Sequence, residues 1–325
     1  MSSQNHYTTK PGTPYLILLI GILAVSTASI FIRYAQSEVP SLVIATYRMV
    51  IAGAMLAPSA ILRERREPVH LSKQTRRDII IAGIFLAFHF ASWIGSLEYT
   101  SVVNSVVLVT TTPLWVALAS PFVLKEKVNL NTFWGLGLAL LGGLLVGLSS
   151  SCVISLNGLL CANSETFFQG NAALGNFLAL MGAWFAAGYL MAGRKARKSM
   201  HLLPYTSRVY GISGIVLIFL TVILSVTGLQ NGGKSLIDLF GNYSPMTFLW
   251  LILLAIVPQN IGHSAFNWSL AYLPATFVSV ALLGEPVGST LLAMIFLGER
   301  PTALQLLGAG LIFTGIIITS RNNHK

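Results

Sequence analysis

Residues 96–142 have the sequence SLEYTSVVNSVVLVTTTPLWVALASPFVLKEKVNLNTFWGLGLALLG. Residues 269–315 repeat this pattern at a fixed offset of 173 residues, with the sequence SLAYLPATFVSVALLGEPVGSTLLAMIFLGERPTALQLLGAGLIFTG. The two segments align without a gap, and the residues they share include, in the first copy, Ser96, Leu97, Tyr99, Val107, Pro113, Leu124, Glu126, Gly135, Gly137, Leu138 and Gly142. Several of these are glycine or proline, which constrain the backbone locally. The match therefore predicts that the second half of the chain duplicates the first.

The composition around this repeat is typical of a membrane protein. Of the 325 residues, 54% are apolar and 9% are charged, and the mean hydropathy is +0.73. A soluble protein carries about 25% charged residues, whereas a membrane-spanning helix needs about 20 apolar residues in succession. Ten stretches approach or meet that length, at 14–35, 41–62, 77–97, 101–124, 131–150, 172–193, 205–228, 246–270, 275–297 and 302–320.

Ten stretches in two copies predict five helices in each half. Because five is odd, the second half would enter the membrane from the opposite side. We therefore expect an all-α integral membrane fold of ten transmembrane helices in two inverted five-helix repeats. The first repeat would occupy 1–150 and the second 172–325, joined by an outward linker loop at 151–171. Secondary transporters are commonly built from such repeats, with a binding site near the membrane midplane.

The net charge of +10 follows this predicted topology. Fifteen of the 20 Lys and Arg residues fall in the two tails or in the segments 63–77, 125–130 and 194–204, which would all lie on one side. This bias is the positive-inside signal, and it predicts a multi-pass protein of the cell membrane with both termini in the cytoplasm. We therefore expect the lipid bilayer, and no nucleic acid, as the surrounding partner.

Cys152 and Cys161 both fall in the predicted outward loop, and the chain has no other cysteine. In an oxidising exterior they could form a disulfide, or they could be two unrelated thiols. Two cysteines make neither a zinc site nor a redox motif, and no metal or cofactor is expected.

Ionisable residues inside a membrane are costly, so each is a candidate for function. Glu285 lies in the middle of a predicted helix, directly before Pro286, which would open the helix locally. Its carboxylate could bind a proton or a cation, or pair with an arginine. Pro113 is the matching helix-break candidate in the first repeat. Arg48 could contact a substrate carboxylate or phosphate, pair with Glu285, or reach the lipid headgroups.

Two predicted helices also carry polar stripes. His89, Trp93 and Ser96 share one helix face. Gln259, His263 and Asn267 share a face of the repeat-related helix, and Asn104 could add a further polar contact. Such residues would face protein or a water-filled cavity, either as core packing or as the lining of a substrate site.

The chain lacks the motifs of the common catalytic and ATP-driven classes. It contains no HExxH, no GxSxG, no paired carboxylates on one helix and no GxxxxGK[ST]. We therefore expect no catalytic residues and no ATP-driven step.

Several short motifs resemble those of the EamA type within the drug/metabolite transporter superfamily. They are PSLVIATYR ending at Arg48, LEYTSVVN, TTPLW and LKEK within 97–127, AYLPA at 271–275, LGEPV at 283–287, and FLGERP at 296–301. The resemblance covers essentially the whole chain. It implies ten helices in two inverted repeats, with alternating access around a central cavity. Family members commonly export amino acids, other metabolites or drugs.

Together these features predict a secondary permease for a small metabolite, such as an amino acid or another amphipathic compound, that works in the export direction. Proton or cation coupling and a homodimer are further expectations. Two other classes stay open: a membrane receptor or channel without carrier activity, and an integral membrane enzyme. An enzyme would need convergent acid and base groups, which the sequence does not display.

Overall fold

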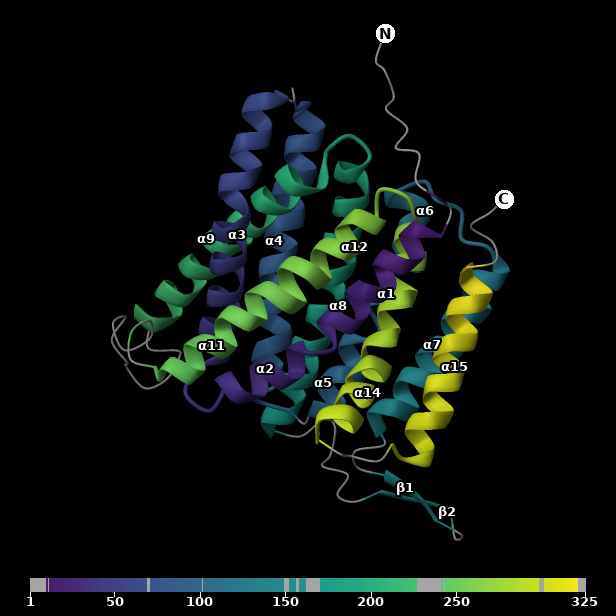
Figure 1. Cartoon of the computed structure of the whole chain (residues 1–325). Coiled ribbons are helices and arrows are strands. Elements are labelled where there is room, and N and C mark those ends of the chain that lie inside the picture. Colours follow the sequence, from purple (N-terminus) through teal and green to yellow (C-terminus); the bar gives the residue numbers. More distant parts are fainter. Residues whose placement is uncertain are drawn as a thin grey trace.

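The computed structural model describes residues 10, 12–68, 71–100, 102–148, 152–155, 158–161, 170–226, 241, 243–297 and 301–320. Nearly all of this part of the chain is helical (Figure 1). Among the described residues, eight helices are long and apolar enough to cross a membrane, and the helices over Val107–Val123 and Leu130–Val146 are apolar but shorter. The predicted class, a helical membrane protein, is confirmed.

The first half of the chain folds into a series of helices joined by short connections. In chain order these are α1 (Thr13–Val25), α2 (Ala28–Ala35), α3 (Ser41–Arg66), α4 (Lys73–Ser96), α5 (Val102–Val109), α6 (Thr112–Val123) and α7 (Leu130–Leu148).

A two-stranded hairpin follows, which the sequence analysis did not predict. It consists of β1 (Cys152–Ser155) and β2 (Gly158–Cys161), and the strands are antiparallel. The second half then contains α8 (Gly170–Arg197), α9 (Leu202–Val226), α11 (Pro245–Leu254), the π-helix η2 (Ala255–His263), α12 (Ser264–Ser269), α13 (Ala275–Ala281), the 3₁₀ turn η3 (Leu282–Gly284), α14 (Glu285–Leu297) and α15 (Ala303–Ser320).

Several of the long apolar stretches are interrupted. The fourth divides before Pro113, which lies in the first turn of α6, and the ninth divides before Pro286, in the first turn of α14. Proline lacks an amide donor and fits the first turn of a helix, where that donor has no partner in any case. The first stretch also divides, between Val25 and Ala28, although it has no proline at that point.

The eighth stretch contains the π-helix η2. Pro258 lies inside it and removes one backbone donor from the helical hydrogen-bond ladder. π-helical segments within α-helices are frequent at functional sites. Here the segment carries two predicted site residues, Gln259 and His263.

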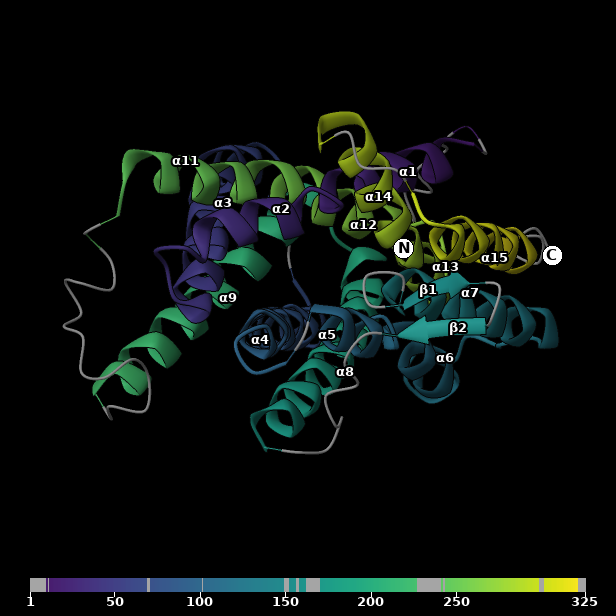
Figure 2. The same ribbon diagram turned by 90° about the horizontal axis from the view of Figure 1, so that it is seen from below.

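The main helix contacts join the two halves of the chain. α3 packs on α9, α4 on α8, α6 on α13, α7 on α15, and α1 on η2. Seen from below, α7 and α15 lie towards one end of the molecule, while α3, α9 and α11 lie towards the other (Figure 2). Residues from both halves therefore form the core.

α7 and α15 make a close contact through glycines. A Cβ at Gly142 would lie 2.5 Å from the carbonyl oxygen of Gly308, and a Cβ at Gly308 would lie 2.6 Å from that of Gly142. Gly135 and Gly315 face each other in the same reciprocal way. No larger residue fits at these positions without separating the two helices.

The ends of the bundle differ in charge. α1 begins and α15 ends at the upper end in Figure 1, where the α3–α4 and α8–α9 connections also lie. These connections follow the last turns of α3 and α8, which carry the cationic residues Arg63, Arg65, Arg66, Arg194, Lys195 and Arg197. The β1–β2 hairpin lies at the opposite end.

Candidate functional site

Arg48 lies on α3 in the interior of the bundle, with 1% of its surface exposed. Its Nε donates a 2.8 Å hydrogen bond to Oε1 of Gln259, and its guanidinium carbon lies 4.1 Å from the centre of the Phe90 ring. The ion pairs among the described residues are Arg63–Glu67, Arg194–Glu126 and Arg208–Glu64, so Arg48 has no carboxylate partner within ion-pair distance there. The sequence analysis predicted a choice of partners for Arg48, and the structure supplies an amide and an aromatic face.

Gln259 is held in place by the π-helix and by its neighbours. Its side chain is fully buried. The hydroxyl of Tyr210, on α9, donates to the backbone carbonyl oxygen of Gln259 over 3.3 Å. It also lies 3.1 Å from the hydroxyl of Ser264. Nδ2 of Asn267 in turn donates weakly to the Tyr210 hydroxyl over 3.5 Å. This network joins α9 to η2 and α12 next to the contact between Gln259 and Arg48.

The predicted histidines and Trp93 surround the same centre. His89 lies 2.9 Å through Nδ1 from the carbonyl oxygen of Gly182, and because a carbonyl only accepts, Nδ1 must carry the proton. The Trp93 ring stacks on His89, with centroids 5.9 Å apart. The ring of His263 packs against Phe90 at 5.4 Å. Two polar stripes that are far apart in the sequence therefore meet across Phe90.

Several polar atoms at this centre have no hydrogen-bond partner among the described residues. They include Nη1 of Arg48, Nε2 of Gln259, Nε1 of Trp93 and Nδ1 of His263, together with Oδ1 of Asn267 and the hydroxyl oxygen of Tyr189. Buried polar atoms are almost always hydrogen-bonded in folded proteins, so a cluster of unpaired ones needs an explanation. The atoms from Arg48, Gln259 and Trp93 can only donate, which suits a ligand that carries acceptors.

Glu285 lies at the start of α14, and its carboxylate is not within ion-pair distance of Arg48. Ser26, in the gap between α1 and α2, donates to the Glu285 backbone carbonyl over 3.0 Å. Ser289 donates from the next turn of α14 to the carbonyl of Ser26, also over 3.0 Å. The break in the first apolar stretch therefore packs against the break in the ninth. The side chain of Asn104, another predicted site residue, lies outside the described part of the structure.

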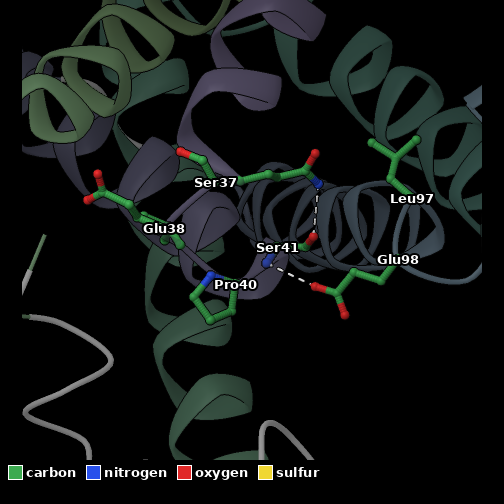
Figure 3. A pocket seen from close by; sticks show the side chains of 8 residues that line it. Ser37, Glu38, Pro40, Ser41, Leu97 and Glu98 are labelled. Atoms are coloured by element: carbon green, nitrogen blue, oxygen red, sulfur yellow. Dashed lines mark hydrogen bonds between the residues drawn. The ribbon is translucent and has the colours of Figure 1, made fainter.

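An open depression of about 510 Å³ lies between the α2–α3 connection and the end of α4 (Figure 3). In Figure 3, Glu38 and Glu98 lie on either side of Pro40 and Ser41, and Oε1 of Glu98 accepts from the backbone N–H of Ser41 over 3.1 Å. The residues that line the depression are Gln36, Ser37, Glu38, Val39, Pro40, Ser41, Leu97 and Glu98. The sequence analysis did not predict this feature, because its residues come from two separate connections.

Three carboxylates cap helices to which they are not adjacent in sequence. Glu98 caps α3, as described above. Glu38 accepts from the backbone N–H and the hydroxyl of Ser244, at the start of α11, over 2.8 Å each. These hydrogen bonds hold the pKa of Glu38 below its usual value. Glu126 accepts from the N–H of Ala275, at the start of α13, and forms a 2.8 Å ion pair with Arg194. Carboxylates are stabilised at helix N-termini by unpaired N–H groups. The contacts of Glu38 and Glu126 also join the two halves of the chain.

The sequence analysis missed several of the residues that build the centre. Tyr210 and Ser264 are ordinary in sequence, and their roles depend on packing between α9 and α12. The structure also pairs Arg208 of α9 with Glu64 of α3. In the sequence, the signal for this pair is Glu64, an acidic residue within the cationic segment 63–77.

A buried polar centre between two halves of an apolar helical bundle is an arrangement common in membrane transporters. The sequence model of the EamA-like transporter family matches residues 12–148 and again residues 173–321. The chain belongs to this family, within the drug/metabolite transporter superfamily. It is therefore a multi-pass membrane protein of a transporter family rather than an enzyme family, and its substrate is a small molecule.

Relatives among known proteins agree with this assignment. The chain is 26% identical to the uncharacterized transporter YxxF of Bacillus subtilis, over 76% of this chain and 71% of that protein. It is 21% identical to an uncharacterized transporter of Archaeoglobus fulgidus, over 96% and 98%. It is 24% identical to the pseudopaline exporter CntI of Pseudomonas aeruginosa, over 94% and 95%. A crystal structure shares the fold with a TM-score of 0.71 at 17% identity, over 97% of this chain and 99% of that one.

Proposed function

We propose that this protein is a secondary transporter that moves a small metabolite, an amino acid or another amphipathic compound, by alternating access around Arg48. The observation that carries the proposal is the buried cation between the two halves, with unpaired donors beside it and no carboxylate at ion-pair distance among the described residues. A buried charge without an opposite charge beside it is costly, so its presence indicates a functional role. Binding an anionic substrate would give Arg48 that role.

The donors favour a carboxylate or a phosphate as the recognised group. Arg48 would use Nη1 and Gln259 would use Nε2, the two atoms left unpaired after their own contact. Arginine is well suited to such groups because its guanidinium donates along fixed directions. The rings of Phe90 and Trp93 would contact the less polar part of the substrate.

Glu285 is the proposed site for a coupling proton or cation. It lies next to Pro286, at the junction with Ser26, and it feels the charge of Arg48. A substrate anion bound at Arg48 would compete with Glu285 for the same positive charge. Substrate binding would therefore change the proton or cation affinity of Glu285, which is the requirement for coupled transport.

We further propose ten spans in two inverted repeats, over 1–150 and 172–325. The glycine contacts support this arrangement, because the offset of 173 converts Gly135–Gly315 into Gly308–Gly142. Two antiparallel helices whose contacts exchange in this way are related by a twofold axis perpendicular to them. The two matches to one family model support the same duplication.

The depression at Glu38 and Glu98 is the proposed outer entrance. It includes Ser41, and Arg48 lies two turns further along α3, about 10 Å away at 1.5 Å per residue. The cationic end would face the cytoplasm, with both termini there, in the cell membrane. The relative CntI is named as an exporter, which supports the export direction.

Counterflow in proteoliposomes tests this proposal. Vesicles loaded with a pooled panel of amino acids, amines, nucleosides and sugar phosphates would be exposed to isotope-labelled panel compounds, and mass spectrometry would follow the exchange. We expect saturable exchange of one anionic or zwitterionic class. Flux without saturation would indicate a channel, binding without flux a receptor, and chemical conversion an enzyme.

A further inference from the structure

The β1–β2 hairpin contains the only two cysteines of the chain, in opposed positions. Its antiparallel register pairs Cys152 with Cys161, and pairs Ser155 with Gly158 next to the loop. The sequence predicted that the cysteines share one loop, but not that their backbones face each other. That register is the new observation.

The type of pair follows from counting along the ladder. Two residues separate the strands, so Ser155 and Gly158 form the hydrogen-bonded pair that flanks a two-residue loop. Hydrogen-bonded and non-hydrogen-bonded pairs alternate from there, which makes Cys152 and Cys161 a non-hydrogen-bonded pair. Cα atoms in such pairs lie about 4.5 Å apart, within the range of about 4.4–6.8 Å that a disulfide spans.

The position of the hairpin in the molecule suits oxidation. It lies at the end of the bundle opposite the cationic connections (Figure 1), and the positive-inside rule assigns that end to the exterior. The segment 128–193 that contains it has no Lys or Arg. Thiols persist in the reducing cytosol, whereas paired cysteines outside it become oxidised.

We infer that Cys152 and Cys161 form an intramolecular cross-strand disulfide. The two thiols would lose two protons and two electrons as the S–S bond forms. A disulfide oxidant of the exterior, either a small molecule or a thiol oxidoreductase, would take them up and become two thiols.

The bond would close the hairpin in the segment that joins the two halves. β1 contacts α15, so the hairpin is attached to the helix pair that carries the reciprocal glycines. The disulfide would restrict this linker in the unfolded chain and would leave the Arg48 centre untouched. The inference does not depend on which substrate is carried.

Differential thiol labelling of the full-length protein in its own membranes tests the inference. Free thiols would be blocked with excess N-ethylmaleimide, the protein denatured and reduced, and newly released thiols labelled with polyethylene-glycol maleimide. We expect a gel shift of two labels per chain, on a monomer in the non-reducing gel. No labels after reduction, or a dimer that reduction dissolves, would overturn the inference.

Mass spectrometry would locate the bond. Trypsin leaves both cysteines in one peptide because no Lys or Arg lies between Lys127 and Arg194, so chymotrypsin is the better protease. A cross-linked pair of peptides that separates on reduction is the expected result. As a matched control, Cys161→Ser combined with Leu160→Cys moves the thiol to the other face of the strand. This variant should have two free thiols, and its oxidation to the same extent would overturn the argument from register.

Discussion

Arg48 carries a positive charge in the interior of an apolar bundle, and its contacts are only just sufficient to keep it there. An arginine at the centre of a membrane helix costs roughly 3 kcal/mol on insertion scales. A desolvated cation–π contact returns about 2 kcal/mol, and a hydrogen bond to a charged group about 2 kcal/mol more. Arg48 has one contact of each kind, to Phe90 and Gln259. A substrate anion therefore finds a cation that is tolerated but not neutralised.

Two substitutions at Gln259 separate the structural role of this residue from its role in binding. Gln259→Leu removes the acceptor of Arg48, so we expect the free energy of unfolding to fall by about 2 kcal/mol and transport to be lost. Gln259→Glu keeps an acceptor and adds an internal anion. It should unfold like the wild type but bind substrate at least tenfold more weakly. Thermal unfolding and counterflow measure the two effects, and wild-type transport by Gln259→Glu would contradict the assignment.

Glu38 gives a prediction for pH. Its ordinary pKa is 4.5, and hydrogen bonds from Ser244 lower it in the folded protein. The contact therefore stabilises the folded protein fully above pH 4.5, and this contribution is lost as the pH falls through the lower, folded value. The difference in melting temperature between wild type and Glu38→Gln should shrink as the pH falls from 7 to 3. A difference that is constant over this range would show that the Ser244 contact does not titrate.

At the scale of the elements, the interruptions of the helices decide where the site forms. Proline predicts two of them from sequence alone, before Pro113 and before Pro286. The break after Val25 has no such signal, because it depends on the contact of Ser26 with α14. The sequence analysis also did not predict the π-helix over Ala255–His263, although Pro258 lies within it. A break caused by proline can be predicted from the local sequence. A break caused by packing against another helix cannot be predicted without knowing which helix that is.

The contact of α7 with α15 can be tested with a matched pair of glycines. Gly142→Ala would place a Cβ 2.5 Å from the carbonyl oxygen of Gly308 and force the helices apart, so we expect a loss of about 1–3 kcal/mol. Gly137→Ala meets nothing within 4 Å and should be neutral or stabilising by up to about 1 kcal/mol. Thermal unfolding in detergent compares the two. Equal stabilities would mean that the close contact is absent in the folded protein.

At the scale of the whole molecule, sequence reasoning predicted the helical membrane class and the family, because composition and the internal repeat are distributed over the entire chain. It also selected Arg48, Gln259, His89 and His263, which meet around Phe90. It could not supply Tyr210 or the entrance at Glu38 and Glu98, because those depend on how distant connections pack. The number of spans and the inverted repeats stay predictions.

The predicted orientation can be tested on intact cells. In a Cys152→Ser/Cys161→Ser background, Ser37→Cys would place a thiol at the proposed outer entrance and Lys198→Cys one in the cationic α8–α9 connection; both positions are exposed. A membrane-impermeant maleimide should label the first in intact cells and the second only after permeabilisation. The reverse pattern would invert the topology and assign the entrance to the cytoplasm.

The central claim is that the buried Arg48 centre is the place where substrate binds during transport. Counterflow should be measured in parallel for the wild type, Arg48→Gln and Arg33→Gln, where Arg33 is an exposed arginine on α2. We predict saturable exchange by the wild type and by Arg33→Gln, and at least a tenfold loss by Arg48→Gln that is folded and inserted. Exchange by Arg48→Gln at the wild-type rate and affinity would contradict the account.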